Sequence, residues 1–84
     1  MLKITKKTEY ALIAIRHIEE NNELVSSNEI ANKYSIPREL MAKTLQLMAK
    51  AGYLKAVKGS KGGYKSQISL DKISLKEFME SIEG

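Results

Sequence analysis

The chain has 84 residues, a formal net charge of +4 and 43% hydrophobic residues, a composition typical of one small globular domain spanning residues 1–84. A core of this size is too small to enclose a deep active site. The chain has no cysteine, which excludes disulfides, thiolate catalysis and Cys-ligated zinc or iron–sulfur clusters, so we expect no such cofactor in this chain.

The first predicted helix runs from about Thr5 to Glu20. Apolar residues recur at helical spacing, and further apolar residues beside them widen this stripe to most of the helix circumference. This indicates a buried helix at the centre of the core. It contains His17, the only histidine of the chain. We expect a structural role for His17, because this residue and Glu20, three positions on, are too few ligands for a closed metal site.

The basic residues at the start of the chain resemble the opening of an export signal. Lys3, Lys6 and Lys7 precede the apolar stretch. Glu9 and Arg16 interrupt that pattern, however, and no small-residue cleavage site follows. We therefore expect a cytoplasmic protein without a membrane-spanning segment.

Two further helices are marked by their start signals. Ser26-Ser27-Asn28-Glu29 is typical of a capping box, in which Ser26 accepts from the Glu29 amide while the Glu29 side chain reaches back. The short helix that follows ends near Tyr34. Pro37 suits a first helical turn and opens a third helix over 37–51, with Gly52 at the left-handed position that follows it.

The pattern then changes from helical to alternating. Residues 53–58 and 64–68 predict two short strands of a hairpin, and Leu24-Val25 fits one short strand. Between the hairpin strands, Gly59-Ser60-Lys61-Gly62-Gly63 is typical of a tip with positive φ angles. Ser74-Leu75-Lys76-Glu77 is a second capping box and starts a final helix.

This order of elements is that of a mainly α fold with a small β-hairpin, a winged helix-turn-helix. The turn Tyr34-Ser35-Ile36 joins its two central helices. In this fold the helix after the turn enters the major groove of DNA, and residues near its start meet base edges. Helix 37–51 is therefore the candidate recognition helix.

Positive charge is concentrated where this fold would meet DNA. Residues 30–65 carry eight basic residues against one acidic residue, Glu39. Arg38, Glu39 and Lys43 are candidates for base contacts, because arginine pairs with guanine and a carboxylate accepts from cytosine. Lys50, near the far end of the helix, suits a phosphate better. The alternative is a solvated polar face, which any amphipathic helix has.

The hairpin is the second candidate surface. Its lysines would displace counterions, and its small glycines let the backbone approach phosphates or enter a minor groove. The candidate backbone contacts are Lys55, Lys58, Gly59, Ser60, Lys61, Gly62, Gly63 and Lys65. The alternative is a charged strand edge that prevents aggregation. The same glycines fail as a P-loop, since Tyr64 stands where its second glycine is required.

Catalysis is not expected of this chain. A sequence with one histidine and no cysteine offers no nucleophile–base pair of the kind that hydrolases and transferases use. We therefore predict that the protein is not an enzyme.

The sequence resembles the Rrf family of bacterial winged-helix transcription regulators over essentially all 84 residues. The resemblance is carried by Ile4–Leu12, by Ala49–Leu54 and by Val57–Tyr64, which resembles the family's wing and is the most specific. It implies a dimeric DNA-binding repressor or activator, with helix 37–51 in the major groove and the wing in the minor groove. It also implies that Thr5 and Lys7 approach phosphates.

The sequence also departs from the family pattern. Family members continue into a long dimerisation helix, where many bind an iron–sulfur cluster through three cysteines. These 84 residues contain neither feature, so a homodimer stays an open question and this chain alone is not expected to sense through a cluster. Ala42 stands where some relatives have a base-reading glutamate, Ser60 where the wing has a proline, and Ser35 where a turn glycine is usual. A left-handed backbone at Ser35 would be strained.

These features lead to one principal prediction and one alternative. The principal prediction is a transcription regulator that binds double-stranded DNA sequence-specifically, with repression the favoured outcome. The alternative is a winged-helix module for protein interaction, because fold does not dictate function. Basic residues on both the recognition helix and the hairpin favour DNA over a protein partner.

Overall fold

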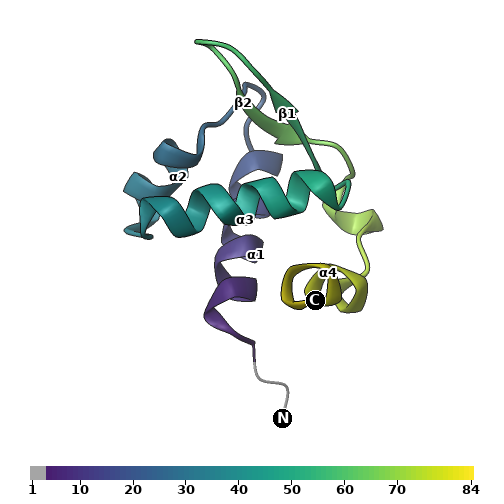
Figure 1. The fold of residues 1–84 in the computed structure, drawn as a ribbon. Helices are drawn as coiled ribbons and strands as arrows, with labels where there is room; N and C mark the ends of the chain where they lie inside the picture. Colours follow the sequence, from purple (N-terminus) through teal and green to yellow (C-terminus); the bar gives the residue numbers. More distant parts are fainter. Residues whose placement is uncertain (1–3) are drawn as a thin grey trace.

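A computed structural model describes residues 4–84 of the protein, so Lys3 of the opening basic run lies outside the described residues. In chain order the elements are α1 (Lys6–Glu19), α2 (Ser27–Tyr34), α3 (Arg38–Lys50), β1 (Leu54–Val57), β2 (Gly63–Ser66), the 3-10 helix η1 (Leu70–Lys72) and α4 (Leu75–Glu83). This order confirms the predicted winged helix-turn-helix, to which η1 is an element that the sequence patterns did not predict. Figure 1 shows α3 crossing in front of α1, with the hairpin projecting beyond one end of α1.

The core is built around α1, as its apolar circumference predicts. Ala11, Ile15 and Ile18 of α1 are at most 1% exposed, and they pack with buried side chains from α3, α4 and the hairpin. The contributions of α3 and α4 are Met41, Leu45, Met48, Phe78 and Ile82. Because α1 is covered on several sides, it fixes the positions of α3 and of the hairpin relative to each other.

Side-chain caps start three of the four α-helices. The hydroxyl of Thr5 accepts from the Thr8 amide, Ser26 from the Glu29 amide and Ser74 from the Glu77 amide. These bonds satisfy amide donors that have no partner inside the helix. The second half of the predicted box at Ser26 is replaced by a tertiary contact, because the Glu29 carboxylate lies 3.1 Å from His17 Nε2.

The turn between α2 and α3 is tight and left-handed. Ser35 has φ 55° and ψ 44°, the strained conformation predicted if the turn required left-handed backbone. Pro37 precedes the first turn of α3 rather than lying within it, because its ψ of 131° is extended. The helix therefore spans 38–50 rather than 37–51, and Gly52 beyond it has the predicted positive φ, 93°.

The hairpin is shorter than the predicted strands 53–58 and 64–68. Its antiparallel pairs run from Leu54 opposite Ser66 to Val57 opposite Gly63. The pairing stops there because the amide of Gly62 donates to the Gly59 carbonyl, 3.0 Å away, and closes the tip. At the other end one further backbone hydrogen bond, 3.0 Å from the Gln67 amide to the Tyr53 carbonyl, follows the last strand pair.

The hairpin is fastened to the helical body at two places. The predicted strand at Leu24-Val25 is a single bridge, in which Val25 and Tyr64 exchange two backbone hydrogen bonds of 3.0 and 2.8 Å. The hydroxyl of Ser66 donates to the Glu19 carboxylate at the end of α1, 2.7 Å away. The strands therefore have a defined direction, while the tip projects beyond both attachments.

Candidate nucleic-acid interface

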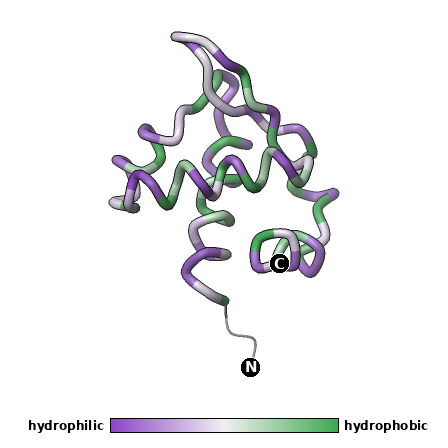
Figure 2. The backbone as a smooth tube through the Cα atoms, viewed as in Figure 1, coloured by the Kyte–Doolittle hydropathy of each residue, from purple (hydrophilic) through white to green (hydrophobic). Residues whose placement is uncertain are grey.

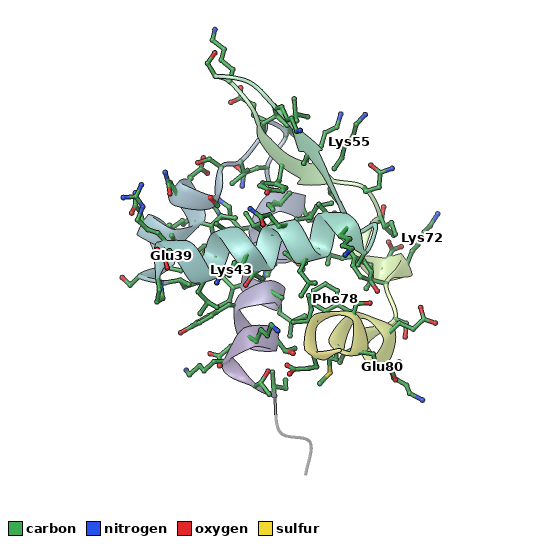
Figure 3. The ribbon with its side chains drawn as sticks, viewed as in Figure 1. Glu39, Lys43, Lys55, Lys72, Phe78 and Glu80 are labelled. Atoms are coloured by element: carbon green, nitrogen blue, oxygen red, sulfur yellow. The ribbon has the colours of Figure 1, made fainter. Side chains whose placement is uncertain are left out.

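The outer face of α3 is polar and exposed. Met41, Leu45 and Met48 bury one side of the helix, and this leaves Arg38, Glu39, Lys43, Gln46 and Lys50 exposed on the rest of its surface. Hydrophilic and hydrophobic residues accordingly alternate along α3 in Figure 2. Figure 3 shows Glu39 and Lys43 on the half of α3 nearer α2, and Lys55 on the hairpin.

The three candidate base-contacting residues are not engaged by charge partners. Among residues 4–84 the ion pairs are Lys6–Glu9, Arg16–Glu20 and His17–Glu29. None of them involves Arg38, Glu39 or Lys43. Arg38 has a neutral partner instead, since its Nε donates to Asn28 Oδ1 of α2 at 3.1 Å.

The hairpin brings its lysines together on one short ribbon. Lys55 of β1 lies directly opposite Lys65 of β2, and both side chains are exposed. Like charges at directly opposite positions destabilise a strand pair. The predicted wing residues of the tip, Lys58, Gly59, Ser60 and Lys61, are also exposed, while Gly62 and Gly63 are half-buried.

The basic surface continues from α3 to the hairpin. An open hollow of about 600 Å³ lies between the end of α3 and β1, with Lys50 and Lys55 among its lining residues. Gly52 and Gln67 also line it. Two predicted phosphate contacts from different elements thus share one concave surface.

Thr5 and Lys7 lie elsewhere, at the start of α1. Figure 1 shows this end of α1 pointing away from the hairpin. The Thr5 hydroxyl also bonds the Glu83 carboxylate of α4, and Thr8 Oγ1 donates to the same carboxylate at 2.5 Å. These hydroxyl bonds, chiefly that of Thr5, lower the pKa of Glu83 from its usual value of 4.5. The structure therefore does not bring Thr5 and Lys7 together with the other candidate residues.

His17 has the structural environment expected of it. The residue is 6% exposed, and its ring joins α1 to α2, with Nδ1 3.0 Å from the Tyr34 hydroxyl and Nε2 3.1 Å from the Glu29 carboxylate. The acidic neighbour is thus Glu29 from α2, and not Glu20 from its own helix. These contacts hold α2 against α1. The positions of the turn and of α3, which follow α2, depend on this packing.

The sequence patterns did not single out Asn28 as part of the site. Asn28 appears in the sequence only as a member of the capping box, and its distance from Arg38 depends on how α2 and α3 cross. The crossing angle between α2 and α3 cannot be predicted from residue types or from their spacing. No sequence signal could therefore have identified the contact.

These elements define a winged helix-turn-helix with exposed basic residues on α3 and on the wing. The chain belongs to the Rrf2 family, whose model, described as an iron-dependent transcriptional regulator, matches residues 4–84. Within those residues, no helix combines the length and apolar character needed to cross a membrane.

Known proteins similar to this chain include transcriptional regulators. The HTH-type transcriptional regulator IscR of Cereibacter sphaeroides is 30% identical over 86 residues, which cover 98% of this chain and 56% of IscR. The HTH-type transcriptional regulator NsrR of Bacillus licheniformis is 29% identical over 84 residues, which cover 98% of this chain and 59% of NsrR. The chain thus spans little more than half the length of these transcriptional regulators.

A solved structure supports the same fold. The global cysteine regulator CymR of B. subtilis matches this chain with a TM-score of 0.88 at 24% identity. The match covers 100% of this chain and 67% of that chain. At this identity the likeness establishes the fold alone.

The residues of this chain do not fit the iron named in the family's description. The 84 residues contain no cysteine. Within the described part of the chain, no group of three or more His, Asp or Glu side chains gathers that could hold a metal ion. We therefore assign no step to iron in this domain.

Proposed function

We propose that this domain binds double-stranded DNA sequence-specifically and regulates transcription, most simply as a repressor. In this proposal α3 enters the major groove, where Arg38, Glu39 and Lys43 meet base edges. Lys50 and the wing from Lys55 to Lys65 contact phosphates and the minor groove. With its side chains an α-helix such as α3 is about 10–12 Å across, which suits a groove about 12 Å wide.

The observation that carries the proposal is the pair Lys55 and Lys65. The two lysines occupy directly opposite positions of the hairpin, an arrangement of like charges that destabilises a strand pair, and no acidic residue occurs between Glu39 and Asp71 to relieve it. Protection of a strand edge would need neither this pairing nor a lysine-rich tip. A polyanion that neutralises both lysines accounts for the arrangement.

The test is selection from a random-sequence duplex library at two salt concentrations, with the solution mass of the protein measured in parallel. We expect a defined motif to be enriched and affinity to fall steeply with salt. A two-fold-symmetric motif bound by a dimer would identify a domain that reads two half-sites, and a single half-site bound by a monomer would identify one reading unit. Absence of binding at both salt concentrations would refute the proposal and favour the protein-interaction module.

A charge-matched pair of variants tests the role of the wing. Lys61→Ala should lower the slope of log Kd against log salt by about 0.9, the value for one phosphate contact. Lys76→Ala removes the same charge from α4, which this proposal places outside the contact, and should leave the slope unchanged. Equal slopes for both variants would contradict the assignment of the wing to DNA.

A further inference from the structure

We infer that Asn28 is a positioning residue for sequence recognition, because it holds Arg38 in the orientation in which that side chain meets a base. The inference rests on the proposed function, since it assumes that α3 reads DNA. It adds a residue from the preceding helix to the set that determines specificity.

The contact joins two helices at their starts. Asn28 lies in the first turn of α2, and Arg38 is the first residue of α3. Asn28 Oδ1 accepts from Arg38 Nε at 3.1 Å, which is within the normal range for such a bond. Both residues are exposed, so the bond lies at the surface, at the start of the helix that the proposed function assigns to DNA, rather than inside the core.

The geometry leaves the recognition end of the guanidinium free. A guanidinium has five N–H donors in a planar fork, and Asn28 occupies the one on Nε. Among the hydrogen bonds of residues 4–84 none involves the two terminal nitrogens, which keep their four donors. These are the donors that can bond O6 and N7 of one guanine together.

The neutral character of Asn28 matters as much as its position. An aspartate or glutamate at this place would pair with Arg38 and cancel the charge that attracts DNA. An amide oxygen restrains the same side chain and leaves its charge uncompensated. Within residues 4–84 no carboxylate forms an ion pair with Arg38.

The position of Arg38 at the start of α3 also supports a role for this residue in recognition. A cation at the first position of a helix faces the positive end of the helix dipole, which is unfavourable for the helix. Stability of α3 therefore does not explain an arginine here. Without a restraint, a long flexible arginine could equally reach a neighbouring phosphate, which carries no sequence information.

The experiment compares binding to the selected duplex and to a random duplex over a series of salt concentrations. Asn28→Ala should lower the ratio of the two affinities by roughly 3- to 10-fold, the effect of one hydrogen bond, and leave random-duplex affinity and the salt slope unchanged. Asn28→Asp keeps the acceptor oxygen, so the ratio should be retained while both affinities fall. Asn32→Ala, an exposed asparagine one turn further along α2, is the matched control and should change neither quantity.

A double-mutant cycle separates positioning from direct contact. In an Arg38→Ala background, Asn28→Ala should cause no further loss of the affinity ratio. An equal loss with and without Arg38 would overturn the inference, because Asn28 would then act on DNA by itself. An unchanged ratio for Asn28→Ala would also overturn it while leaving the proposed function intact. Failure of the wild-type domain to select any duplex would instead refute the proposed function.

Discussion

Gly63 is the position where one added methyl group should break the attachment of the wing to Val25. Gly63 has φ 154°, and a Cβ atom built there would lie 2.8 Å from the Val25 carbonyl oxygen and 3.0 Å from the Val25 carbonyl carbon. Both are backbone atoms, so no side chain can move aside. Gly63→Ala should therefore push β2 away from Val25 and break the two hydrogen bonds between Val25 and Tyr64.

The size of the effect follows from those two bonds. At about 1 kcal/mol each, their loss costs about 2 kcal/mol, before any strain at the new alanine is added. For a domain of this size, Tm should fall by roughly 8–16 °C. Thermal unfolding followed by circular dichroism measures this fall directly.

A variant at the exposed tip provides the control. Ser60→Ala lies beyond both attachments of the hairpin, and it should change the free energy of unfolding by no more than about 0.5 kcal/mol. A Tm for Gly63→Ala that matches that of Ser60→Ala would refute the reasoning. It would mean that the bridge to Val25 does not contribute to the stability of the wing.

Two further variants test other parts of the fold. Ser35→Gly should raise the free energy of unfolding by about 1 kcal/mol, because glycine adopts the left-handed backbone at Ser35 without strain; a lower Tm than that of the wild type would rule this out. Glu83→Gln should reveal a pH-dependent contribution of the carboxylate. Because the folded-state pKa of Glu83 lies below its usual value of 4.5, the stability it adds is complete above that value and is lost as the pH falls through the folded-state pKa. The Tm difference between wild type and Glu83→Gln should therefore be larger near pH 7 than near pH 3, and an equal difference at both would count against the Thr5 and Thr8 contacts.

Local signals determined how much of the fold could be predicted. Ser26 and Ser74 are capping residues whose hydrogen bonds involve neighbours three positions away, so sequence spacing alone locates them. Gly52 marks the end of α3 for the same local reason. The helices were therefore predictable to within a residue or two, although the start of α3 was placed one residue early.

Tertiary contacts account for what the sequence could not supply. Glu29 satisfies the local pattern of a capping box, yet its carboxylate bonds His17, a residue of α1. The hairpin register that puts Lys55 opposite Lys65 depends on where the tip closes, and the predicted strands had no fixed register. The candidate DNA-contacting residues follow from their charge and their position in the fold. Asn28, in contrast, can be identified only once the relative placement of α2 and α3 is known.

The bonds from Glu83 to the hydroxyls of Thr5 and Thr8 have a consequence for the folding of the chain. They connect residues 78 and 75 positions apart, so forming them closes a loop of nearly the whole chain. Contacts of such high sequence separation raise the contact order and tie the first helical turn to the last. Fraying at one end would release the other, so we expect amide hydrogen exchange in the first turn of α1 and the last turn of α4 to quicken together.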